Sequence, residues 1–199
     1  PPDYRVRVRM YRHGLGDCFL LTFPRKNREP FQMLIDCGVL GRDKEFVAGM
    51  VRHLRDTVRA DSRDPAAKAH IDVVAATHEH KDHLSGFNQA RKLFNDDFEF
   101  GAVWLGWTEN LTQKEVQKIK EARKKAVRTL HAALSGPLRN STALAGVEEL
   151  MGFSDAEDVT EADSIAKALE YLKVRGDKAG ELRYLEPGID PIDLEGVDG

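Results

Sequence analysis

The sequence predicts an α/β fold, with helices layered on a sheet, and three observations lead to this prediction. The first forty residues contain three short strand patterns separated by turns. The apolar run "IDVVAAT", 71–77, is typical of a strand that is buried on both faces. Segments with apolar residues at helical spacing lie on both sides of this run. With 199 residues, of which 41% are hydrophobic, the chain is long enough for one sizeable core.

Three strands are predicted before residue 40. In "YRVRVRMY", 4–11, Tyr, Val and Met alternate with Arg, which predicts a half-buried strand with its apolar face toward the core. The turn "HGLGD" leads into a mostly buried strand over 18–23, and a third strand is predicted over 31–36.

Helices and strands alternate in the rest of the chain. The predicted helices cover about 43–58, 84–94, 112–134, 143–152 and 162–175, and the predicted strands cover 71–77, 98–107 and 181–188. This order favours a layered α/β arrangement built around the buried strand.

Charge is distributed unevenly although the net charge is only −3. Residues 111–139 hold eight Lys or Arg against two Glu, whereas residues 140–199 hold five against fifteen Asp or Glu. The basic stretch has the charge to follow a phosphate backbone, but it lacks the interleaved aromatic residues of a single-strand binder. A solvated helix face is the simpler interpretation, so a nucleic-acid partner stays an open alternative.

The two cysteines, Cys18 and Cys37, are too few for a disulfide scaffold, and both lie in apolar segments. We therefore expect buried free thiols and a cytoplasmic location. No apolar run approaches the roughly 18 residues that a membrane span needs, so no membrane partner is expected. The polar, alternating first ten residues do not have the pattern of a secretion signal.

Residues 75–87, "AATHEHKDHLSGF", crowd His78, His80, Asp82 and His83 into six positions after the buried strand. His78 and His80 are two apart, so in extended backbone their rings point the same way and can bind one metal ion. Asp82 and His83 follow on the next turn and are directed toward a second ion. Imidazole and carboxylate ligands suit zinc, and also iron or manganese. The alternative interpretation is a polar loop that is His-rich by chance.

The stretch "THEHKDH" resembles the T-H-x-H-x-D-H motif of the metallo-β-lactamase superfamily. Upstream, "MLIDCG", 33–38, is similar to the family's strand that ends in Asp and Gly, and "GLGDCFLL", 14–21, to the glycine-rich turn and strand before it. The spacing looks closest to the domains related to bacterial competence (DNA-uptake) proteins. This resemblance covers about residues 4–107.

The resemblance implies a sandwich of two sheets flanked by helices, the αββα fold, and a metal-dependent hydrolase with one or two zinc ions. His78 and His80 would bind the first ion, and Asp82 and His83 the second. Asp36 would lie beneath the site and orient the loop. Asp82 would also be catalytic, orienting the attacking water and carrying its proton. Members of the family act on lactams, lactones, thioesters and phosphodiesters, so either a small molecule or a phosphodiester is the expected substrate.

The chain departs from the family after His83, because the later histidines and the bridging aspartate are missing. Only His131 remains, in the middle of a predicted helix, while His13 in the glycine-rich turn could lie near the site. Truncation, degeneration or a partner chain would each explain the missing ligands, and we favour truncation.

We therefore expect a metal-binding N-terminal half over 1–110, a helical segment packed on or inserted in the same domain over 111–180, and a last strand and linker over 181–199. A non-catalytic module that binds protein or nucleic acid is the alternative function.

Overall fold

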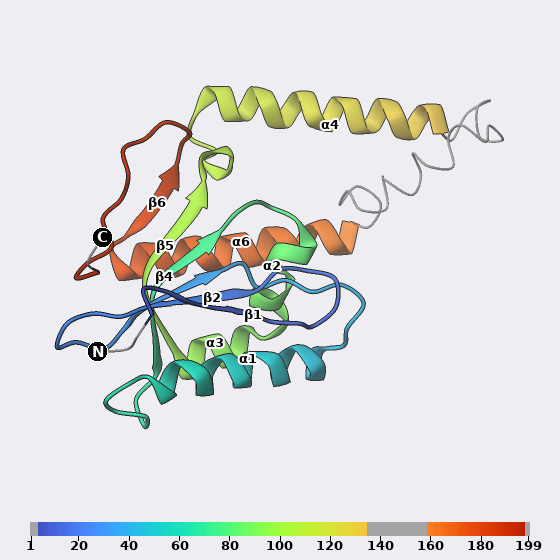
Figure 1. Ribbon diagram of the computed structural model, residues 1–199. Helices are drawn as coiled ribbons and strands as arrows, with labels where there is room; N and C mark the ends of the chain where they lie inside the picture. Colours follow the sequence, from blue (N-terminus) through green and yellow to red (C-terminus); the bar gives the residue numbers. More distant parts are fainter. Residues whose placement is uncertain (1–3, 135–158, 198–199) are drawn as a thin grey trace.

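The computed structural model describes residues 4–134 and 159–197 (Figure 1). The helix predicted near 143–152 lies outside these residues. The described strands form one sheet in the order β1-β2-β3-β4-β5-β6. Their bounds are β1 Arg7–Met10, β2 Phe19–Phe23, β3 Phe31–Ile35, β4 Ala69–Ala76, β5 Phe98–Gly106 and β6 Leu182–Leu185.

The sheet is mixed, which confirms the α/β class. Strands β1, β2 and β3 pair antiparallel, whereas β3, β4, β5 and β6 pair parallel. Because β3 and β4 are parallel neighbours, their carboxyl ends meet at one edge of the sheet, where α/β proteins commonly bind ligands. The predicted histidine loop follows β4 at this edge.

The predicted helices are present within the described residues, with one difference. The helices are α1 Lys44–Ala60, α2 Lys81–Gln89, α3 Arg91–Asp97, α4 Lys114–Leu134 and α6 Val159–Ala179, with a short 3₁₀ turn at Trp107–Glu109. The single helix predicted over 84–94 is two helices, because the backbone of Ala90 leaves the helical conformation between α2 and α3. None of the described helices combines the length and apolarity that crossing a membrane requires.

Helices α1, α2, α3 and α6 cover one face of the sheet and enclose the main core with it (Figure 1). The fully buried Phe87 and Phe94, from α2 and α3, pack in this core with Leu34 of β3 and Leu54 of α1. Cys18 and Cys37 are buried free thiols, as predicted. The core thus fixes α2, and with it the loop before α2, against the sheet.

The opposite face of the sheet is only partly covered. Phe31, Met33, Val73 and Ala102 form a small cluster there, against which the C-terminal Leu194 and Val197 pack. The predicted burial of β1 is wrong: its apolar alternation is present, but Val8 is 59% and Met10 64% exposed. β1 is an edge strand, and all six described strands belong to this one sheet, so no second sheet among the described residues covers its apolar face.

Helix α4 leaves the body of the fold after β5 and extends beyond the sheet (Figure 1). Of the apolar residues at helical spacing in α4, Val116 is buried, whereas Ile119 is 45% exposed. The spacing of apolar residues therefore predicts the helix correctly, but it does not predict that Ile119 is exposed.

Candidate metal centre

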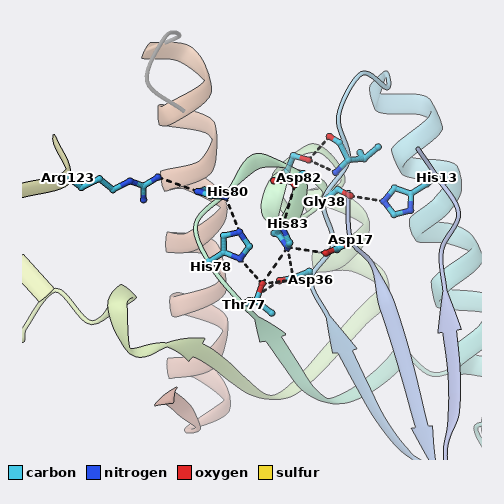
Figure 2. A network of polar contacts seen from close by, with 12 residues as sticks. His13, Asp17, Asp36, Gly38, Thr77, His78, His80, Asp82, His83 and Arg123 are labelled. Atoms are coloured by element: carbon cyan, nitrogen blue, oxygen red, sulfur yellow. Dashed lines mark hydrogen bonds and ion pairs between the residues drawn. The ribbon is translucent and has the colours of Figure 1, made fainter. Parts of the chain in front are cut away.

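Three chain segments meet at the carboxyl end of the parallel strands and build the site (Figure 2). They are the turn that leads into β2, the loop after β3, and the segment made of the loop after β4 and the first turn of α2, which holds Asp82 and His83. The amide of Asp17 donates to the carbonyl of Asp82 (2.9 Å), and the amide of Gly38 donates to the carbonyl of Asp17 (3.0 Å). The amide of Cys37 also donates to the carbonyl of His83 (2.9 Å). These backbone bonds fix the three segments relative to one another.

Two glycines make this close approach possible. A Cβ on Gly38 would lie 2.1 Å from the carbonyl carbon of Asp82 and 2.2 Å from the amide nitrogen of His83. A Cβ on Gly16 would lie 2.4 Å from the carbonyl oxygen of Gly38, and Gly16 also has a φ of +131°. Both positions therefore require glycine for the segments to touch.

Replacing Gly38 with Ala should destabilise the protein and loosen the histidine loop, because backbone atoms cannot yield to the new methyl group. Overpacking of this kind costs roughly 1–3 kcal/mol, which corresponds to a fall in Tm of about 2–12 °C. Thermal unfolding followed by circular dichroism measures the change. Gly49→Ala, in α1, is the matched control, because its Cβ would meet only a side-chain nitrogen at 4.0 Å. Equal Tm values for the two variants would contradict the packing argument.

The rings of the three motif histidines lie close together, with centroids no more than 6.5 Å apart. His78 Nε2 lies 3.0 Å from His80 Nδ1, and the ring centroids of His78 and His83 are 3.9 Å apart. Two nitrogens bound to one tetrahedral zinc ion at about 2.0–2.1 Å would lie roughly 3.3 Å apart. The spacing of His78 and His80 therefore fits the two nitrogens of one metal site.

Hydrogen bonds fix which nitrogen of His78 is available. Thr77 Oγ1 donates to Asp36 Oδ2 (2.7 Å) and so accepts from His78 Nδ1, which lies 2.9 Å away. His78 then carries its proton on Nδ1 and presents the lone pair of Nε2 toward His80. Burial, followed by the nearby His83, lowers the pKa of His78. Both effects favour the neutral imidazole, which is the form that binds a metal ion.

Asp36 lies beneath the loop and organises it. Its carboxylate is buried, accepts the Thr77 amide on Oδ1 (2.8 Å), and contacts His83 Nδ1 through Oδ2 (2.8 Å). Asp36 also has a φ of +55°, an uncommon conformation for a residue with a side chain, and one that costs on the order of 1 kcal/mol or more. The surrounding bonds hold this strained residue in place under the loop.

His83 faces carboxylates with both of its nitrogens. Nε2 lies 3.5 Å from Asp82 Oδ2, and Nδ1 lies 3.7 Å from Asp17 Oδ2 in addition to its contact with Asp36. The ligand atoms of Asp17, Asp36 and His83 all lie within 4.8 Å of one another, which is close enough to hold a metal ion. The donor set of the whole cluster, imidazole and carboxylate, suits zinc, iron or manganese.

Asp17 was not among the residues predicted for the site. The sequence feature that could have indicated Asp17 is the glycine-rich turn "GLGD". In this turn an acidic residue directly follows a glycine that permits close backbone approach. His13, in the same turn, lies beside the site: its ring is buried, with Nε2 2.7 Å from the carbonyl oxygen of Gly38 (Figure 2). His131 lies in α4, and its side chain is outside the described part of the structure.

Comparisons of this chain with protein families, with curated proteins and with solved structures found no match.

Proposed function

We propose that the protein is a metal-dependent hydrolase of the metallo-β-lactamase superfamily, with zinc as the expected metal and the αββα sandwich as the expected fold. The observation that carries this proposal is the convergence of His78, His80 and His83 above the buried Asp36, at the carboxyl end of β4. A polar loop that is His-rich by chance has no reason to bring three imidazoles together over a buried carboxylate at the end of a strand.

The hydrogen bonds support a specific ligand set. His78 Nε2 and His80 Nδ1 would bind the first ion. His83 Nδ1 is held by Asp36, which leaves His83 Nε2, the nitrogen nearer Asp82, for the second ion. Metal-binding histidines commonly give their other nitrogen to a carboxylate in this way. Asp17 lies on the Nδ1 side of His83, where it forms an alternative ligand group with Asp36 and His83 rather than a further ligand of an ion at Nε2.

A bound zinc ion would lower the pKa of a water molecule toward 7 and polarise the oxygen of the bond under attack. The carboxylate of Asp82 is 38% exposed at the rim, where it can orient that water and accept its proton. Asp36 is shielded from substrate, so its contribution is to hold His83 and Thr77 in place. These roles suit the hydrolysis of an ester, amide or phosphodiester.

A non-catalytic binding module is the second candidate. A catalytic zinc site has about three protein ligands and one open position. The described residues offer two ligands for the first ion, and the exposed apolar face of β1 would suit a bound partner. Turnover by the zinc-loaded protein separates the two candidates.

Asp82→Asn should abolish hydrolysis, because an amide cannot accept the proton of the attacking water. General-base catalysis contributes roughly 10²–10⁴-fold, so turnover should fall by that factor. The assay uses zinc-loaded protein and chromogenic phosphodiester, lactam, lactone and thioester substrates. Asp56→Asn, at an exposed position in α1, is the control. Wild-type turnover in Asp82→Asn would show that Asp82 has no chemical role, and no turnover by the wild-type protein would favour the binding module.

A further inference from the structure

Helix α4 is held against the histidine loop by an ion-pair cluster. Lys120 Nζ lies 2.6 Å from Glu79 Oε2 and 2.9 Å from Glu109 Oε2. Glu79 is the residue between His78 and His80, and the side chain of Glu109 is only 3% exposed. Because a buried carboxylate without its partner is costly, these ion pairs keep this part of α4 beside the loop.

Arg123, almost one turn further along α4, reaches the loop from this position. Its Nη2 lies 3.3 Å from His80 Nε2 (Figure 2), and its Nη1 lies 3.5 Å from Glu79 Oε1. A guanidinium has only N–H donors, so His80 Nε2 accepts this bond with its lone pair. A neutral imidazole carries one N–H, and in His80 that proton is therefore on Nδ1.

The contact completes a chain of hydrogen bonds that runs from Arg123 to the buried carboxylate of Asp36 (Figure 2). His80 Nδ1 donates to His78 Nε2 (3.0 Å), and His78 Nδ1 donates to Thr77 Oγ1 (2.9 Å). Thr77 Oγ1 donates in turn to Asp36 Oδ2 (2.7 Å). Every bond is donated in the direction of Asp36, so the chain links a cation at one end to an anion at the other. Hydrogen bonds aligned in this way polarise and strengthen one another.

This chain occupies both nitrogens that the proposed first ion needs. His78 Nε2 accepts from His80 Nδ1, so neither nitrogen has a lone pair to give to a metal ion. Binding through His80 Nδ1 requires the proton of this ring to be on Nε2 instead, which keeps the imidazole neutral. That N–H would face the guanidinium of Arg123, where two donors meet. The positive charge of Arg123 also opposes the charge of the ion.

The exposure of the side chain allows Arg123 to withdraw while α4 stays in place. The Arg123 side chain is 48% exposed, whereas that of Lys120 is 25% exposed and bonded to two carboxylates. The guanidinium can therefore turn into solvent without breaking the ion pairs of Lys120. We propose that Arg123 is a latch on the metal centre, which competes with zinc for His80 and must leave this ring when the first ion binds. This inference rests on the proposed function, because it concerns the loading of the same metal centre.

The experiment compares two methionine variants of the full chain, Arg123→Met and Arg128→Met. Methionine has no hydrogen-bond donor and favours a helix about as well as arginine does. Arg128 is exposed and lies about 7.5 Å along the helix axis and about 140° around it from Arg123, so it is the matched control for the lost charge.

Zinc affinity is measured by competition with a chromophoric chelator at physiological salt. Contacts next to metal ligands typically change affinity 10–100-fold, so Arg123→Met should bind zinc at least about tenfold more tightly than the wild type. Arg128→Met should gain less than about twofold, because salt screens an exposed charge at this distance. An equal gain in the two variants would assign the effect to general charge and overturn the latch.

Nitrogen NMR of the histidine rings tests the hydrogen-bond chain without zinc. In the zinc-free wild type and in Arg128→Met, His80 should carry its proton on Nδ1, and zinc should move it to Nε2 in the wild type. A proton on Nε2 of His80 in the zinc-free wild type would overturn the latch.

The zinc measurement also separates this inference from the proposed function. Equal zinc affinities of the wild type and Arg123→Met would reject the latch and leave the metal centre in place. If neither protein binds zinc, the metal centre itself is rejected, and the proposed function fails together with the latch. Zinc bound by Arg123→Met and not by the wild type would support both.

Discussion

His78→Ala combined with His80→Ala should remove most of the zinc that the protein binds. The two side chains supply the imidazole nitrogens that lie 3.0 Å apart, and alanine offers no ligand in their place. Substituting residues that only support ligands commonly costs 10–100-fold in metal affinity, so removing two ligands should reduce bound zinc per chain at least tenfold. Elemental analysis after dialysis against a weak chelator measures this content.

The matched control removes two other histidines, His53→Ala with His70→Ala. Both side chains are exposed and come from α1 and β4, away from the loop. Unfolding provides a second measurement, since a ligand at 100 times its Kd stabilises the folded state by about 2.7 kcal/mol. Zinc should raise the Tm of the wild type and of this control, but not that of the loop variant. Equal zinc contents in the two variants would reject the assignment of His78 and His80.

Local sequence patterns predicted most of the elements in the described residues, because their periodicity reflects the face that each element buries. The strand 71–77 and the helix 43–58 correspond to β4 and α1. The predictions that were wrong concern features that the spacing of apolar residues does not encode. The alternation in β1 cannot reveal that this strand lies at the edge of the sheet, with Val8 exposed. The spacing through 84–94 likewise hides the change of backbone conformation at Ala90.

The same distinction applies to the site. His78, His80 and His83 are close in sequence, so their grouping is visible in the motif itself. Asp36 was identified through resemblance, because 41 residues separate it from the Thr77 that it contacts. Asp17 and Lys120 were missed because they reach the loop only through tertiary structure. Asp17 depends on the backbone approach at Gly16 and Gly38, and Lys120 on the path of α4.

Asp36→Asn should weaken zinc binding without removing a predicted ligand, which tests whether the buried carboxylate positions the others. The carboxylate accepts from the Thr77 amide on one oxygen and faces the Thr77 hydroxyl and His83 Nδ1 with the other. An asparagine at this position that still accepts from the Thr77 amide directs its own NH₂ group toward the Thr77 hydroxyl and His83 Nδ1. All three of these groups are then hydrogen-bond donors without an acceptor among them. Leaving buried donors unpaired costs roughly 1–3 kcal/mol, which corresponds to a fall in Tm of about 2–12 °C.

The effect on metal binding follows from the protonation of the histidines. Without the acceptor at Asp36, the Thr77 hydroxyl no longer has to accept from His78 Nδ1, and His83 loses the bond that turns Nε2 toward Asp82. Zinc affinity, measured by competition with a chromophoric chelator, should fall 10–100-fold. Asp97→Asn, which alters a half-buried ion pair with Arg55 far from the loop, controls for a general loss of stability. A lower Tm with unchanged zinc affinity would assign Asp36 to the fold alone, whereas a loss of affinity beyond that of the control would assign it to the metal centre.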